Sequence, residues 1–145
     1  MPAVVADANV LIAARLQRDG NHQAGRAIAN GFDTGDLPQA YVTSGVVTEV
    51  TNYLLRRIGP NAAVETLDAL IESSGYEVTF TPKADFDAGR SLFRTYDGLS
   101  LTDAVIVAYM ERTGLEYLYS FDDDFDAVDG VTRLTAPVNP FHPES

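Results

Sequence analysis

The sequence predicts an α/β protein with a parallel β-sheet of about four to five short strands, flanked by helices in three layers. Two observations support this class. Short apolar runs, too brief for helices, recur along the chain, and amphipathic segments with helical periodicity separate them. Strands that are apolar on both faces are typical of a parallel sheet covered by helices on both sides. The 145 residues fit a single domain, 1–145, with a proline-rich tail over 137–145.

The N-terminal part predicts one strand, two helices and a loop. Residues 3–6 are apolar and end at Asp7, which indicates a short buried strand. Apolar residues at helical spacing predict helices over 9–18 and 22–30, and a glycine follows and ends each of them. The stretch 31–39 is rich in Gly, Asp and Pro and indicates a loop.

The middle of the chain predicts a helical hairpin, a second strand and a further helix. Residues 44–58 and 61–73 each carry one apolar stripe at helical spacing, and Gly59-Pro60 separates them. Residues 76–81 alternate around two apolar side chains and indicate a strand. A proline then opens a helix over 82–96.

The C-terminal part predicts the most buried helix and two more strands. Residues 100–113 are so apolar that this helix is expected to be nearly central in the fold, and Gly114 ends it. Residues 118–121 and 131–135 are short apolar runs that indicate strands. Ligands of a parallel α/β sheet bind beyond the carboxyl ends of its strands, so the residues at those ends are the first functional candidates.

Composition excludes several kinds of site. The chain is 46% hydrophobic and has no cysteine, which excludes a disulfide scaffold, thiol catalysis and thiolate-bound zinc. Its two histidines are too few for a three-histidine metal centre, so any metal ion has to be bound by oxygen. No apolar run approaches the ~20 residues of a membrane span and no signal-like segment is present, so we expect no membrane association and a cytoplasmic location.

The charge of the chain is strongly negative, because 21 acidic residues against 10 basic ones give −11. Arginine outnumbers lysine nine to one and aspartate outnumbers glutamate fourteen to seven. This balance resembles the halophilic proteins of salt-accumulating archaea. At 1 M salt the Debye length falls to ~3 Å, so repulsion from nucleic-acid phosphates would be largely screened. The negative charge therefore does not exclude a nucleic-acid substrate.

Four acidic residues border apolar elements, where a carboxylate loses solvation that a surface acid keeps. Asp7 follows the first strand, and Glu49 borders the apolar stripe of its helix. Asp103 begins the most apolar helix, and Asp122 follows the third predicted strand. Each has a structural alternative: a helix cap for Asp7, a solvated helix edge for Glu49, and a capping box with Ser100 for Asp103. The alternative for Asp122 is a solvated acidic turn.

A parallel α/β sheet brings two strand ends and the start of the central helix to one edge, so these acids are expected to meet there. Two carboxylates ~4 Å apart repel by about 4 kcal/mol at an effective dielectric of ~20, so a cluster of four requires a cation. Ligands that are all oxygen suit Mg²⁺ or Mn²⁺, which share their coordination with substrate phosphates. The chemistry that follows is metal-assisted hydrolysis of a phosphodiester bond.

Four blocks of the sequence resemble the motifs of the PIN-domain nucleases, in the same order along nearly the whole chain. The first is similar to the family's opening Asp-x-Asn-x-Leu-Leu, the second to its helix with an acidic Glu, the third to its third acidic block, and the fourth to its Ser/Thr-x-Asp-x-Asp-Phe. Length and element order also resemble the small members that serve as ribonuclease toxins of VapBC toxin–antitoxin pairs. The blocks are residues 7–12, 48–52, 100–106 and 120–125.

This resemblance implies a PIN-like fold and a divalent-metal-dependent endoribonuclease that leaves a 5′-phosphate. Asp124 would be a fifth acid, as an outer or additional ligand. Asn9 and Ser120 would orient the loops and hydrogen-bond the ligands, because carboxylate ligands need such support. The catalytic acids, which would also bind Mg²⁺ or Mn²⁺, would be Asp7, Glu49, Asp103 and Asp122.

The resemblance also implies three partners: an RNA substrate, a second copy of the chain in a homodimer, and a VapB-like antitoxin whose tail blocks the site. The chain departs from the small toxins because it lacks their basic surface for RNA. Arg15 and Arg94 are the candidate phosphate contacts, with a solvated surface role as the alternative. His22 is interpreted as a polar residue at a helix start and not as an acid catalyst.

Three other functions stay open on the sequence alone. The chain could be a PIN-domain nuclease of RNA processing that is not a toxin. A phosphatase of the haloacid-dehalogenase type also opens with a strand and an Asp, but it needs a second Asp two residues later, where this chain has Asn9. An acidic binding or regulatory domain without catalysis is the third possibility, although all four acids are present.

Overall fold

The computed structural model describes residues 2–142, so part of the predicted tail, 143–145, lies outside the described residues. Five parallel strands form one sheet in the described part of the chain, in the order β3-β2-β1-β4-β5. The predicted parallel α/β architecture is therefore confirmed. The strands are β1 (Ala3–Ala6), β2 (Gln39–Thr43), β3 (Tyr76–Thr79), β4 (Tyr117–Tyr119) and β5 (Thr132–Leu134).

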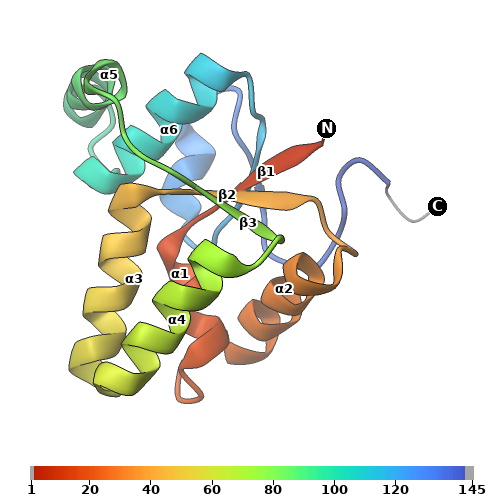
Figure 1. The fold of residues 1–145 in the computed structure, drawn as a ribbon. Helices are drawn as coiled ribbons and strands as arrows, with labels where there is room; N and C mark the ends of the chain where they lie inside the picture. Colours follow the sequence, from red (N-terminus) through yellow and green to blue (C-terminus); the bar gives the residue numbers. More distant parts are fainter. Residues whose placement is uncertain (1, 143–145) are drawn as a thin grey trace.

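Helices cover both faces of the sheet, as the three-layer prediction requires. Figure 1 shows α5 and α6 on one side of the strands and α1 to α4 on the other. No helix within residues 2–142 is long and apolar enough to cross a membrane. The α-helices are α1 (Ala8–Arg15), α2 (His22–Thr34), α3 (Ser44–Arg57), α4 (Pro60–Glu72), α5 (Lys83–Thr95) and α6 (Leu101–Thr113).

The main difference from the sequence prediction is β2. The sequence predicts no strand between the loop over 31–39 and the helix that begins at residue 44, and β2 lies there. β2 pairs with both β1 and β3, and its residues Ala40 and Val42 are fully buried. The strand is only five residues long and leads directly into α3, because the hydroxyl of Thr43 caps that helix by accepting from the N–H of Val46. A second addition is a 3₁₀ turn, η1 (Asp123–Ala127), in the acidic run after β4.

The helices α1 and α2 end at residues other than the predicted ones. α1 stops at Arg15 because Leu16 turns into an extended conformation and packs against the core. α2 continues past Gly31 to Thr34, and Gly35 ends it in the left-handed conformation. Gly31 lies inside the helix, and a β-carbon at this position would come within 2.5 Å of the Leu37 side chain. This glycine serves close packing and does not terminate the helix.

The order of the strands fixes where a ligand site can form. The chain moves from β1 to β2 on one side of the sheet and returns from β3 to β4 on the other side of β1. The connections leave opposite faces, and the crevice between them lies beyond the carboxyl ends of β1 and β4. The backbone N–H of Asp7 donates to the carbonyl of Tyr119 at 3.0 Å, which joins these two strand ends.

Candidate active site

Asp7 directly follows β1 and caps α1. Its side chain is 4% exposed. Oδ1 accepts a hydrogen bond from the N–H of Ala8 and Oδ2 accepts one from the hydroxyl of Ser120, both at 2.8 Å. Burial, and then the nearby charges of Glu49 and Asp122, raise the pKa of Asp7 to about 6, although the two hydrogen bonds lower it. Asp7 is held firmly at the strand end but is costly to ionise there.

The Ser120 hydroxyl connects the ends of β1 and β4. It is fully buried, donates to Asp7, and accepts from the side-chain amide of Asn9 at 3.2 Å and from the N–H of Asp122 at 3.0 Å. Asn9 also accepts the N–H of Phe121 at 3.1 Å through Oδ1. Asn9 and Ser120 therefore hold the loop after β4 against the start of α1.

Asp103 and Glu49 approach the same edge from two helices. Asp103 lies in the first turn of α6, where its N–H donates to the Ser100 hydroxyl at 3.1 Å, so the predicted helix cap forms. Burial and the charges of Asp7 and Asp122 raise the pKa of Asp103 to about 7. Glu49 lies on the exposed rim of α3, and partial burial together with the charge of Asp103 raises its pKa as well.

The acidic run after β4 adds a second group of carboxylates. Asp122 caps η1 by accepting the N–H of Asp124 at 2.9 Å. Asp122, Asp123 and Asp124 each offer one oxygen within 4.8 Å of the others, and within residues 2–142 this is the one acidic group of three that is so tight. Gly98, in the loop before α6, lies against the Asp124 carboxylate, where an added β-carbon would come within 2.9 Å of Oδ1.

The structure brings the four predicted acids into one electrostatic neighbourhood. The charge of each raises the pKa of at least one other. No three of these four carboxylates offer oxygens within 4.8 Å of one another, so among the described residues they are more widely spread than the Asp122 to Asp124 group. Ion pairs in the described part of the chain engage Asp85, Asp87 and Asp126, and none of the four acids is in one. None of the four is therefore paired with a cation in a salt bridge. The pKa of Arg133 is raised by its hydrogen bond to Asp126 and in part by the charge of Asp122, but its salt bridge is with Asp126 instead.

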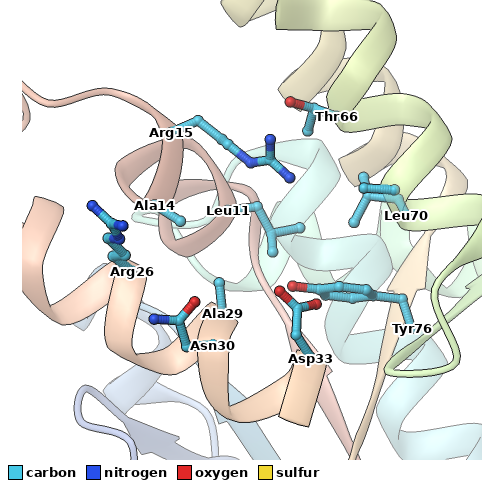
Figure 2. A pocket seen from close by; sticks show the side chains of 11 residues that line it. Leu11, Ala14, Arg15, Arg26, Ala29, Asn30, Asp33, Thr66, Leu70 and Tyr76 are labelled. Atoms are coloured by element: carbon cyan, nitrogen blue, oxygen red, sulfur yellow. The ribbon is translucent and has the colours of Figure 1, made fainter.

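Arg15 is directed away from the acids. Figure 2 shows it reaching across a pocket between α1, α2 and α4, toward Thr66, with Asp33 and Tyr76 at the other side. This pocket has a volume of about 240 Å³, and none of the four acids lines it. This pocket is therefore separate from the acidic edge.

The remaining predicted side chains have simpler surroundings. Arg94 lies exposed in the last turn of α5, one loop before α6. His22 begins α2, at the helix start that the sequence indicates, and its Nδ1 lies 2.7 Å from the carbonyl oxygen of Ala13 in α1, so it joins two helices. Sequence reasoning missed Arg133, whose guanidinium contacts the carbonyl of Ser120. The sequence offers one signal for this residue, because Arg133 is a single arginine in a predicted apolar strand and lies close to an acidic run.

These features define a class: a parallel α/β domain with acidic side chains gathered where its strand order reverses. Residues 4–131 match the model of the PIN domain, and the chain belongs to this family. None of the curated proteins matches the sequence significantly.

Solved structures with the same fold include toxins of toxin–antitoxin systems. VapC20 of Mycobacterium tuberculosis, described as a Sarcin-Ricin loop cleaving toxin, has a TM-score of 0.77 at 22% identity over 94% of this chain and 99% of that one. A toxin–antitoxin complex from Klebsiella pneumoniae has a TM-score of 0.63 at 20% identity, and the match covers 94% of this chain and 98% of that one. The structure of VapBC2 from Rickettsia felis, bound to a DNA fragment from their promoter, has a TM-score of 0.66 at 12% identity. The match covers 92% of this chain and 98% of that one.

Proposed function

We propose that this chain is a divalent-metal-dependent endoribonuclease and the toxin of a VapBC-type pair. The observation that carries the proposal is the set of four carboxylates at the switch point of the sheet. None of them is in a salt bridge within residues 2–142, and the pKa values of Asp7, Glu49 and Asp103 are raised. Protein carboxylates that repel one another in this way are arranged for a cation that binds later. Membership of the PIN domain family and the fold shared with VapC20 support the same conclusion.

The chemistry of the donors fits Mg²⁺ or Mn²⁺. Both prefer oxygen ligands, keep several waters, and tolerate a shell shared between protein and substrate phosphate. Once bound, such an ion lowers the pKa of water and stabilises charge on the phosphate oxygens. We assign its ligands to Asp7, Glu49, Asp103 and Asp122.

The other side chains of the site orient these ligands. Ser120 fixes one oxygen of Asp7 through its hydroxyl and the N–H of Ala8 bonds the other, and we propose that the remaining lone pairs of this carboxylate bind the ion. Asn9 keeps Ser120 and the following peptide in place. Asp124 and Asp123 lie beside Asp122, and we propose that Asp124 binds a water of the ion's shell.

The proposed substrate is RNA, and its phosphates would approach the acidic edge. Arg94 is the better placed of the two candidate arginines, because it precedes the loop that adjoins Asp124, whereas Arg15 points into the separate pocket. The proposed partners are a VapB-like antitoxin and a second copy of the chain. Toxin–antitoxin complexes among the matched structures support the antitoxin.

Two measurements on matched proteins test this function. Thermal melting with and without Mn²⁺ should show a rise in Tm for the wild type and none for Asp7→Asn. Cleavage of total RNA in Mg²⁺ should require Asp7, and the products should carry 5′-phosphates. Asp68→Asn, an exposed acid in α4, is the control and should behave as the wild type. A wild type whose Tm ignores Mn²⁺, or RNA cleavage that survives Asp7→Asn, would contradict the proposal.

A further inference from the structure

Arg133 lies in β5 and reaches across the segment that carries Asp122. Its side chain is 18% exposed. Nε and Nη2 donate to the two oxygens of Asp126 at 2.9 and 3.0 Å, and Nη1 donates to the carbonyl oxygen of Ser120 at 3.2 Å. One guanidinium therefore ties both ends of the segment 120–126 to β5.

The backbone around Arg133 is a firm support for these contacts. β5 pairs with β4, and Arg133 stands opposite Leu118, a fully buried residue of the core. The N–H of Ser120 donates to the carbonyl of Leu134 at 3.1 Å, so the ladder continues up to the segment itself. Because the strand is fixed, the direction of the Arg133 side chain helps to set the position of residues 120–126.

The groups between the two tied ends are those of the proposed site. The Ser120 hydroxyl holds Asp7 and receives the N–H of Asp122, whose carboxylate in turn receives the N–H of Asp124. These bonds form a chain, so a displaced Ser120 peptide would shift the hydroxyl and the Asp122 backbone together. A displacement of even part of an ångström changes how carboxylates share one ion.

We propose that Arg133 is a positioning residue of the acidic site, holding the segment 120–126 so that Asp122 faces Asp7 and Asp103. The inference rests on the proposed function. The planar fork of an arginine is needed, because two of its donors bind one carboxylate while a third binds a carbonyl in another direction. Lysine offers a point charge without that geometry.

Geometry and charge predict opposite effects when Arg133 is removed, which makes the role testable. A positive charge near the site repels a divalent cation, so loss of the charge alone would strengthen metal binding. Loss of an orienting contact weakens it, typically by about 10-fold or more. We expect Arg133→Met and Arg133→Lys both to bind Mn²⁺ about 10-fold more weakly than the wild type in titration calorimetry at fixed salt.

Two further variants separate positioning from general destabilisation. Asp126→Asn keeps the arginine but removes its bidentate partner, and it should also weaken Mn²⁺ binding. Arg112→Met removes the other bidentate pair, that with Asp85, far along α6 from the site, and should lower Tm while leaving Mn²⁺ affinity unchanged. Amide hydrogen exchange without metal gives an independent readout, since the N–H groups of Asp122 and Asp124 should exchange faster in Arg133→Met.

The outcomes distinguish this inference from the proposed function. Equal or tighter Mn²⁺ binding by Arg133→Met, with unchanged amide exchange, would overturn the positioning role while the proposed function stands. Full recovery of affinity in Arg133→Lys would also overturn it, because charge would then suffice. If Arg133→Met does not fold, Asp126→Asn and Arg133→Lys decide the question. A wild type that binds no Mn²⁺ would overturn both proposals.

Discussion

At the scale of single residues, the acidic edge combines a buried carboxylate with a hydroxyl that is used three times. The Ser120 hydroxyl donates to Asp7 and accepts from Asn9 and from the backbone of Asp122. Its hydrogen-bonding capacity is thus used on both sides of the crevice, and no buried side-chain oxygen or nitrogen in the described part of the chain lacks a partner. The destabilising features of this edge are the desolvation of its carboxylates and, after it, their mutual repulsion, and not unsatisfied hydrogen bonding.

The substitution Asp103→Asn removes one repelling charge at nearly constant shape. The pKa of Asp103, about 7, reflects burial and two neighbouring carboxylates. Because the side chain is partly exposed, the expected gain in the free energy of unfolding is only about 1 kcal/mol. In metal-free buffer at pH 8 we expect a Tm about 2–4 °C above the wild type by scanning calorimetry. The same variant should cleave no RNA. Lower stability than Asp68→Asn would contradict the repulsion argument.

The raised pKa values of Asp7 and Asp103 predict how stability depends on pH. Their folded-state pKa values, about 6 and about 7, lie above the ordinary value of 3.8, so the folded chain binds more protons than the unfolded chain between pH 4 and 7. Tm without metal should therefore rise as pH falls from 8 to 5. Asp103→Asn should flatten this rise. Saturating Mn²⁺ should abolish it, because the ion then neutralises the carboxylates.

The position of a residue in the sequence decided whether its place in the site could be predicted. Asp7, Asp103 and Asp122 border short apolar runs, so their positions at strand ends or a helix start could be inferred from the chain itself. Arg133 could not be found in this way. Its importance depends on contacts with Ser120 and Asp126, and such contacts arise only after β5 has paired with β4.

At the scale of elements, long periodic segments were located most closely, and one of the five strands described above was not predicted. The helices over residues 44–58 and 100–113 were located nearly to the residue, because their apolar stripes extend over several turns. β2 was missed, since five residues next to a polar loop carry too little alternation to be distinguished from that loop. Tertiary pairing with β1 and β3, and not local preference, makes this segment a strand.

The contact between α5 and α6 predicts the effect of one methyl group. A β-carbon on Gly89 would come within 2.7 Å of the Val105 side chain and 3.1 Å of its Cα, so Gly89→Ala should push the two helices apart. We expect a loss of about 1–3 kcal/mol in chemical denaturation. The control is Gly45→Ala in α3, where the nearest atom is 3.7 Å away and no loss is expected. Equal stabilities of the two variants would contradict the close approach.

At the scale of the whole molecule, the excess of acidic residues over basic ones gives a charge of −11 on 145 residues. Most of these carboxylates lie outside the crevice, and their mutual repulsion opposes the compact state at low ionic strength. The same repulsion acts on an approaching polyanion. Salt therefore affects both folding and substrate binding in the same direction for this chain.

This charge predicts an unusual salt dependence of the proposed reaction. Nucleases that bind RNA through basic surfaces lose affinity as salt rises. Here, raising KCl from 0.1 M to 2 M at constant free Mg²⁺ should increase both Tm and the rate of RNA cleavage, because screening shortens the Debye length from about 10 Å to below 3 Å. Initial rates on one RNA at several KCl concentrations measure this. A rate that falls steadily with salt would contradict the screening argument.

The place of β4 beside β1 in the sheet has a consequence for a chain that is still being translated. β4 and Asp122 are made after residue 116 of 145, yet they form one wall of the crevice whose other wall, Asp7, is made first. A nascent chain that stops before β4 lacks one wall of this crevice. If the chain cleaves RNA, the ribosome that synthesises it is not exposed to a finished active site until β4 and Asp122 have been made.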